Sequence, residues 1–332
     1  MKRKNHKNGS RLGPVPGRIF SSRKLGFAVA ILVVGTLPYV TSFHIATEIL
    51  IFGILATAFN LLLGYTGLFS WGQAVFFGAG AYAAGNLLLH WQTNWFVALV
   101  GGAAAGALVA LLIGWFSTRT KGLYFILMTI AFNQVAYLIA ITWKPATGGN
   151  NGLQGIPRPD LELGFITFSL QSSLAFYWFT FVIFLVCYYL FKRIINSPMG
   201  LIFGSIKENE DRMLAIGYNT NVYKMFSVLI SGTMSGVAGS LYALHWGLVP
   251  ISSIDLLQSS NIVFMSILGG VGHPLGPVIG AGIYIFLRDV ISSIWPRWPL
   301  ILGVVIILVV FLLRGGLVEI WQLIKERFLS NR

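Results

Sequence analysis

Histidines and acidic residues are the side chains of this chain that could bind a metal ion or move a proton. The five histidines are His6, His44, His90, His245 and His273. They show neither the HExxH motif nor another pair at metal-ligand spacing, and the ten acidic residues form no motif-like pair for acid–base catalysis. A phosphate-binding loop needs a glycine followed by a lysine, and this dipeptide is absent from the sequence. The sequence therefore predicts no enzyme, no metal, no cofactor and no ATP site of that type.

Four side-chain amides interrupt apolar runs and are the next candidates for a functional role. They are Asn60, Gln73, Asn133 and Gln134. Amides in apolar helices most often hydrogen-bond to neighbouring helices. The alternative is that some of them line a polar path, and Gln73 is the best candidate because it directly follows the predicted helix break "GLFSWG" (67–72). Such non-helical backbone must be buried in protein or line a cavity.

The elements that carry these residues must lie in a membrane, because the chain is too apolar for water. Hydrophobic residues make up 56% of the 332 and charged residues 10%, whereas soluble domains have roughly a quarter charged residues. About 20 apolar residues cross a bilayer as a helix, and no run alternates as a membrane barrel strand does. The fold class is therefore an all-α polytopic membrane protein with about ten transmembrane helices. The predicted spans are 25–44, 46–63, 73–90, 95–116, 123–142, 173–191, 223–246, 256–271, 277–295 and 299–313.

Glycines spaced four residues apart predict close packing between these helices. The pairs are Gly102 with Gly106, Gly232 with Gly236, and Gly276 with Gly280.

The basic residues predict an orientation for the spans. With both termini on one side, that side holds 19 of the 23 lysine and arginine residues, and basic segments stay in the cytoplasm. The predicted regions are a basic cytoplasmic extension at 1–24, helices one to six at 25–191, a cytoplasmic loop at 192–222, helices seven to ten at 223–313 and a cytoplasmic tail at 314–332. The extension anchors the first span, so the net charge of +13 does not indicate a nucleic-acid partner.

The cytoplasmic loop contains a charged stretch, "SPMGLIFGSIKENEDRMLAIGYNT" (197–220), that is unlike the rest of the chain. Ser197 is a suitable N-cap, and Pro198 suits a first helical residue. Asn209 can cap a second helix, and Gly217 is expected just after its end. Helices this short are unstable alone. Either they rest on the membrane or on the protein's own loops, or they form a docking site for a cytoplasmic partner.

Five stretches in a fixed order give the chain a resemblance to a known family. They are "NLLLGYTGLFSWGQAVFFGAGAY" (60–82), "KGLYFILMTIAFNQ" (121–134), "TGGNNGLQGIPRP" (147–159), the charged stretch extended to 197–243, and "SILGGVGHPLGPVIGAGIY" (266–284). The chain resembles the permease subunits of ABC importers for branched-chain amino acids, the LivM-like branch, and more distantly the urea and ribose permeases. The resemblance implies a bacterial inner-membrane location. It also implies a second permease subunit as heterodimer partner, two ATP-binding subunits and an extracytoplasmic substrate-binding protein.

The resemblance further implies that residues 198 to 217 form the segment that couples the permease to its ATP-binding subunits. The candidate coupling residues are Pro198, Gly200, Ile206, Glu208, Asn209, Glu210, Ala215 and Gly217. Leu201 and Gly204 stand where the family often has arginine, so this coupling segment is less basic than is usual.

Two further sites follow from the same resemblance. The amides become candidates for the translocation path of a zwitterionic amino acid. The candidate contact with the binding protein consists of Gly148, Gly149, Asn150 and Gly152. The alternative for this glycine-rich stretch is a flexible connector.

Other function classes remain as alternatives. The same type of permease could carry urea or another small polar solute, because the binding protein largely sets selectivity. An ion-coupled secondary transporter would need charges at the bilayer midplane. Only Arg288 and Asp289 are candidates, and Trp295 and Trp298 suggest that an interface is near.

Overall fold

Helices form almost all of the secondary structure. The computed structural model describes residues 38, 41–162, 167–295, 297–312 and 316. Its long helices are α2 (Phe43–Asn60), α3 (Gln73–His90), α4 (Trp95–Ser117), α5 (Leu123–Thr142), α7 (Ser173–Ile195), α10 (Thr220–Trp246), α11 (Leu256–Gly269), α12 (Gly276–Ile294) and α13 (Trp298–Leu312). The shorter ones are the π-helix η1 (Leu61–Thr66), α6 (Lys144–Thr147), α8 (Pro198–Glu208), α9 (Glu210–Ala215) and the 3₁₀-helices η2 (Gly149–Asn151) and η3 (Ile251–Ser253).

The long helices follow the predicted spans closely, because each apolar run is bounded by polar residues or glycine. Six are long and apolar enough to cross a membrane, namely α2 with η1, α4, α5, α7, α10 and α12. The apolar helices α11 and α13 are shorter, and α3, with 18 residues, is not among the six. The predicted span 25–44 and the predicted regions 1–24 and 314–332 lie almost entirely outside the described residues. The chain is thus an all-α polytopic membrane protein, with six of the ten predicted spans supported.

Small residues let the central helices approach closely. α10 packs against α2, α3 and α4. A Cβ atom added to Gly106 would lie 2.4 Å from the carbonyl oxygen of Gly232, and one added to Gly280 would lie 1.9 Å from that of Met265. The predicted packing role of the glycine pairs is therefore confirmed. Every element named here belongs to one compact unit, which begins at Phe43.

The predicted helix break precedes α3. Residues 67–72 are non-helical, as predicted, and Leu68, Ser70 and Gly72 are buried within the protein. The break follows η1, whose wider turns end at Gly67 with a φ of +78°. The protein thereby supplies the buried environment that irregular backbone needs at membrane depth.

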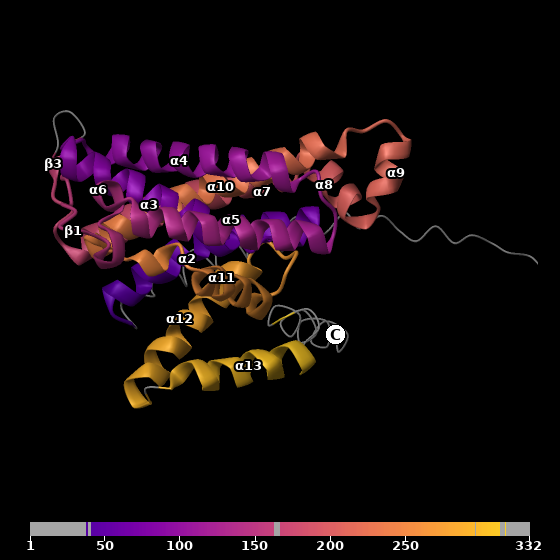
Figure 1. The fold of residues 1–332 in the computed structure, drawn as a ribbon. Coiled ribbons are helices and arrows are strands. Elements are labelled where there is room, and N and C mark those ends of the chain that lie inside the picture. The colour runs from indigo at the N-terminus through magenta and orange to yellow at the C-terminus, as the bar shows by residue number, and fades with distance from the viewer. Residues whose placement is uncertain (1–37, 39–40, 163–166, 296, 313–315, 317–332) are drawn as a thin grey trace, which may run out of the picture. The chain divides into compact units, whose positions relative to one another are not determined.

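Short connections lie at the two ends of this unit (Figure 1). One end carries α8 and α9. The other carries α6 and two antiparallel strand pairs, which the sequence did not predict. In these pairs β1 (Leu153–Gln154) lies beside β4 (Leu248–Val249), and β2 (Leu161–Glu162) lies beside β3 (Thr167–Phe168).

Candidate functional site

The charged stretch folds into two short helices, as the sequence predicts. α8 begins at Pro198, and the side chain of Asn209 caps α9 by accepting a hydrogen bond from the N–H of Arg212 at 2.9 Å. Gly217 follows α9 with a φ of +92°. The N–H groups of Gly217 and Tyr218 donate back into the last turn at 3.0 and 3.1 Å, which is the Schellman pattern. The predicted cap and helix end are therefore confirmed.

Ser197 occupies the N-cap position of α8, as predicted. Its backbone is extended, as at an N-cap, but its side chain accepts no capping hydrogen bond. The hydroxyl instead donates to the carbonyl oxygen of Ile194 at 2.6 Å. That oxygen is in the last turn of α7, where carbonyl groups lack helical partners.

Buried contacts hold α8 against the membrane helices. Phe203 and Ile206 are buried. Gly200 is also buried, and a Cβ atom added there would lie 2.2 Å from the carbonyl oxygen of Ile195. The Lys207 ammonium donates to the carbonyl oxygen of Gly64 in η1 at 2.7 Å. Among the candidate coupling residues, Gly200 and Ile206 thus lie inside the protein.

An ion pair fastens α9 to the start of α10. The Lys224 side chain is 3% exposed and lies 2.5 Å from a carboxylate oxygen of Glu210, which is 18% exposed. The Thr220 hydroxyl donates to the same oxygen at 3.0 Å. The short helices therefore rest on the protein's own structure along their inner side, which explains how they persist below the length at which isolated helices are stable.

A second ion pair is fully exposed. Lys121 lies 2.8 Å from Asp211, with side-chain exposures of 56% and 85%. The hydrogen bond from Lys121 lowers the pKa of the Asp211 carboxyl, and the same bond raises the pKa of Lys121. Exposed pairs contribute little to stability, so this pair orients α9 only weakly.

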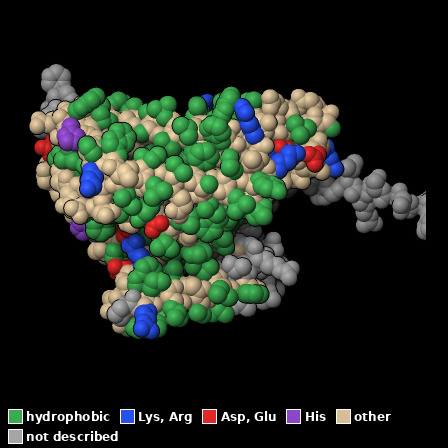
Figure 2. Space-filling model, in the orientation of Figure 1, with side chains coloured by type: hydrophobic (Ala, Val, Ile, Leu, Met, Phe, Trp, Pro, Cys, Tyr) green, Lys and Arg blue, Asp and Glu red, His purple; other side chains and the backbone are tan. Residues whose placement is uncertain are grey.

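The outer side of α8 and α9 is exposed. The candidate coupling residues on it are Pro198, Glu208, Asn209, Ala215 and Gly217. The same segment exposes three apolar side chains, Leu201, Leu214 and Ile216, and a Cβ atom added to Gly204 would touch nothing within 4 Å. Acidic and basic side chains gather at this end of the molecule (Figure 2). An apolar surface with a charged rim is typical of an interaction site.

The comparison with protein families decides the class. Residues 41–313 match the family described as branched-chain amino acid transport system / permease component. The chain belongs to this family.

Relatives extend over most of the permease. It is 25% identical over 314 residues to the high-affinity branched-chain amino acid transport system permease protein LivM of Escherichia coli, covering 88% of this chain and 74% of that protein. It is 22% identical over 269 residues to the probable LivM of Methanocaldococcus jannaschii, covering 71% and 76%. The probable LivH of the same organism is 32% identical over 101 residues, 30% of this chain and 31% of that protein. No solved structure matches the permease significantly.

Three of the four candidate amides of the permease are fully buried. Gln73 is 0% exposed, and its amide nitrogen donates to the hydroxyls of Ser231 and Ser235 on α10 at 2.9 and 2.6 Å. Its carbonyl oxygen has no hydrogen-bond partner within the described residues. The sequence did not single out the two serines, although the spacing of four residues between Ser227, Ser231 and Ser235 on α10 was a visible signal.

The other amides differ in their surroundings. Asn60 accepts from the N–H of Gly272 at 2.8 Å and donates to the carbonyl oxygen of His273 at 3.1 Å, so both of its polar groups hold the loop before α12. Asn133 donates to the carbonyl oxygen of Ile254 at 3.0 Å, and its own oxygen has no partner in the described part of the chain. Gln134 is exposed on the other side of α5, so the four amides do not form one cluster.

Arg288, which the sequence singled out, forms an ion pair inside the helical bundle with a residue that the sequence did not single out. Arg288 on α12 lies 2.6 Å from Glu48 on α2, with side-chain exposures of 30% and 7%. Glu48 is the only acid in the apolar run "ATEILIFGILATAFN" (46–60), a signal that could have found it. Asp289, the neighbouring charge, is exposed. The pair satisfies two charges that would each be costly in an apolar environment.

The glycine-rich stretch of the permease is ordered by its backbone. Gly148, Gly149 and Gly152 have φ values of +75°, +63° and +70°. A Cβ atom added to Gly152 would lie 2.3 Å from the carbonyl oxygen of Val249 in β4. Asn150 is exposed at the tip. The stretch therefore forms a series of turns that the β1–β4 pairing joins to the end of α10.

Proposed function

We propose that the permease forms half of the transmembrane path of an ATP-driven importer for branched-chain amino acids and that ATP-binding subunits dock on the outer face of α8 and α9. The observation that carries the proposal is the contrast within this segment. Its inner side is fixed by Phe203, Ile206, Lys207 and Glu210, and its outer side leaves three apolar residues exposed. A surface that is both exposed and rigidly held transmits movement from a docked subunit to the membrane helices.

The route of transmission begins at Lys207. Its hydrogen bond to Gly64 joins α8 to η1, and η1 leads through residues 67–72 into Gln73. Movement of α8 therefore displaces the break that positions the Gln73 side chain. We assign Gln73 and Asn133 to the translocation path because each keeps a buried amide oxygen that has no partner among the residues the structure describes, and a solute's ammonium group would satisfy such an oxygen.

The remaining parts of the assembly follow from the family. The permease pairs with a second permease subunit, with both termini in the cytoplasm and ten spans in the inner membrane. ATP is hydrolysed by the two ATP-binding subunits. The ordered tip at Asn150 faces outside and offers a rigid contact for the binding protein.

Co-purification tests the docking surface. Ala215→Arg places a bulky charge on the outer face, and Gly217→Pro removes the N–H that closes α9. Both should reduce the amount of ATP-binding subunit recovered with the permease by at least tenfold. In Ala215→Arg an unpaired charge in the interface costs several kcal/mol, and in Gly217→Pro the end of α9 loses its closing hydrogen bond. Gln154→Arg, an exposed position at the opposite end, is the matched control and should leave recovery unchanged.

Substrate-stimulated ATP hydrolysis is the second readout. If both outer-face variants express normally, recover the ATP-binding subunits and couple hydrolysis to leucine uptake at the wild-type rate, the docking proposal is wrong. If both variants fail and the control succeeds, the outer face is the coupling surface.

A further inference from the structure

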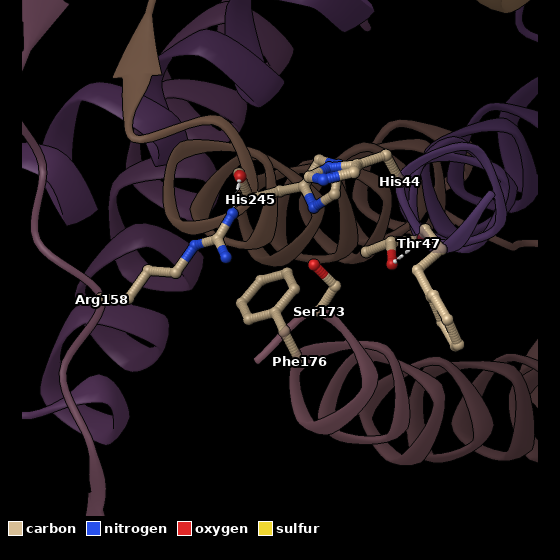
Figure 3. Close-up of a pocket in the computed structure, with 7 residues that line it drawn as sticks. His44, Thr47, Arg158, Ser173, Phe176 and His245 are labelled. Atoms are coloured by element: carbon tan, nitrogen blue, oxygen red, sulfur yellow. Dashed lines mark hydrogen bonds between the residues drawn. The ribbon is translucent and has the colours of Figure 1, made fainter. Parts of the chain in front are cut away.

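A hollow lies where the starts of α2 and α7 meet the end of α10 (Figure 3). The side chains of His44, Arg158 and His245 line it closely, and it has no room for a water molecule. The Arg158 guanidinium donates to the carbonyl oxygen of Leu244 at 2.8 Å. The interior at this end is filled by the protein itself, and a further partner has to bind to an outer face of the helices.

The helices α4 and α5 have the most exposed outer faces. They are the least buried of the six described helices that can cross a membrane. They contact each other and run side by side along the bundle (Figure 1), and hydrophobic side chains cover much of this side (Figure 2). An apolar face of a membrane helix contacts either lipid or another membrane helix, and polar residues on the face distinguish the two cases.

The exposed face of α4 is suited to lipid. Every exposed residue of α4 is apolar, from Phe96 to Phe116. Its small residues Gly102 and Gly106 are buried against α3 and α10. Lipid tails cover such an outer face without loss, because none of its side chains needs a hydrogen-bond partner.

The exposed face of α5 carries a side-chain amide. Gln134 is exposed, and its side chain forms no hydrogen bond with the described residues. Thr142, exposed near the end of the same helix, instead donates to the carbonyl oxygen of Leu138 at 2.9 Å. Gln134 lies eleven residues after the start of α5 and eight before its end, which is about 16 and 12 Å along the helix axis. A glutamine side chain is too short to reach water at either membrane surface.

The residues around Gln134 form a surface that fits a second helix. Leu127, Ala131, Val135 and Leu138 are exposed and are spaced so that they share one side of the helix. The small Ala131 lets another backbone approach closely. The apolar neighbours on both sides of the amide do not suit the wall of a water-filled path.

We propose that residues 127–138 of α5 form the contact with the second permease subunit and that Gln134 hydrogen-bonds to a polar group of that subunit. The inference rests on the proposed pairing of the two permeases. Lipid offers an amide no partner, so amides in membrane helices hydrogen-bond to neighbouring helices. The ATP-binding subunits and the binding protein lie outside the bilayer, which leaves the second permease as the partner that reaches this depth. The opposite side of α5 packs on its own bundle through Phe125, Thr129 and Asn133.

Photo-crosslinking in membranes that contain the complete importer tests the proposal. p-Benzoylphenylalanine replaces Leu138 on α5 or, as the matched control, Leu108 on α4. The two leucines are 59% and 68% exposed. Position 138 should give a crosslink to an epitope-tagged second permease subunit, and position 108 at least tenfold less of it. No crosslink at 138, a crosslink only within the chain, or equal yields at the two positions would overturn the assignment of α5.

Removal of the amide tests its hydrogen bond. Gln134→Leu should lower the recovery of the second permease subunit in mild detergent about threefold to tenfold. Folding should be unaffected, because the Gln134 side chain has no bond within the described chain. Gln171→Leu, at an exposed glutamine before α7, is the control and should leave recovery unchanged. Equal recovery with the two variants would contradict the proposed bond.

Cysteine labelling separates a protein contact from a water-filled path. In a Cys187→Ala background, Gln134→Cys should be protected from an impermeant methanethiosulfonate in the assembled importer. Labelling from either side would place position 134 in an aqueous path and overturn the proposal. If the wild-type permease recovers no second subunit, the pairing and the contact both fail. If it recovers the subunit and position 138 stays uncrosslinked, only the assignment of α5 fails.

Discussion

The two ends of the helical bundle hold their short segments by different means. At one end, α8 and α9 are fastened by side chains, above all the Glu210–Lys224 pair and the Lys207 bond to Gly64. At the other end, the stretch from Gly148 to Gly155 is held by backbone conformation and by the β1–β4 pairing. Side-chain ties allow a segment to shift as a unit, whereas positive φ angles fix the path of the chain itself. The difference is the one expected if the proposed coupling segment moves and the proposed contact surface at the other end stays fixed.

The largest expected effect comes from breaking the buried ion pair. Glu210→Gln leaves the Lys224 ammonium, 3% exposed, without a counter-charge. Loss of one partner of a buried pair costs about 3–5 kcal/mol. The free energy of unfolding, measured in detergent micelles by tryptophan fluorescence, should fall accordingly. Asp211→Asn, the neighbouring acid, is the control. Equal destabilisation by the two variants would show that α9 is not held by this pair.

A smaller loss of stability is expected at the end of the bundle that carries β1 and β4. Gly152→Ala combines a φ of +70° with a Cβ atom 2.3 Å from the carbonyl oxygen of Val249, and such strain costs about 1–3 kcal/mol. Gly155 has a similar φ of +76°, but a Cβ atom added there would have no neighbour within 4 Å. Gly155→Ala therefore measures the cost of the backbone conformation alone, without a steric clash. Hydrogen exchange at Leu153 and Val249 should accelerate more in the first variant. Equal rates would mean that the strand pairing does not hold the stretch.

The turn after α9 should tolerate an alanine substitution better than the Gly152 position does. Gly217→Ala places a Cβ atom in open space, so only the cost of a φ of +92° remains, about 1–2 kcal/mol. Recovery of ATP-binding subunits should fall less than with Gly217→Pro, which also loses the N–H. A stronger defect in the alanine variant would contradict the Schellman end as the reason for glycine here.

Breaking the exposed Lys121–Asp211 pair should have the smallest effect on stability, and that effect should depend on pH. Lys121 lowers the pKa of Asp211, so the pair's contribution is present above the unfolded-state pKa of aspartate. It is lost as the pH falls through the lower folded-state pKa, below about 4. At neutral pH, Lys121→Met should leave the thermal midpoint within error at 0.5 M salt, because salt screens exposed pairs. A clear drop there would assign the pair a structural role.

Much of the fold was predictable because local patterns decide it. The helix boundaries follow apolar runs, and Asn209 and Gly217 act through their own turns. What local patterns cannot give is which side of an apolar helix faces the protein. Asn133 and Gln134 are neighbours on α5, yet one is buried and the other exposed, because successive helical residues lie about 100° apart.

Partners distant in sequence were also beyond prediction. Ser197 stands at the N-cap of α8, as expected, but its hydroxyl donates to an acceptor at the end of α7 and makes no capping bond. The buried Glu48 carboxylate is explained by its ion pair with Arg288. The conformation of the glycine-rich stretch is explained by its packing against β4. In each case the deciding contact comes from another element, and no periodicity within the segment encodes it.

The Glu48–Arg288 pair has a consequence for how the protein is made. The two residues are 240 positions apart, and a ribosome adds about 5–20 residues per second, so roughly 12–48 s separate their synthesis. During that interval α2 enters the bilayer with a carboxyl group that has no counter-charge, which is costly in an apolar environment. Glu48 lies five residues after the start of α2. We expect α2 to reach its final place only when α12 is inserted, so a ribosome stalled before Arg288 should leave Glu48 accessible to a carboxyl-reactive carbodiimide, and the completed chain should protect it.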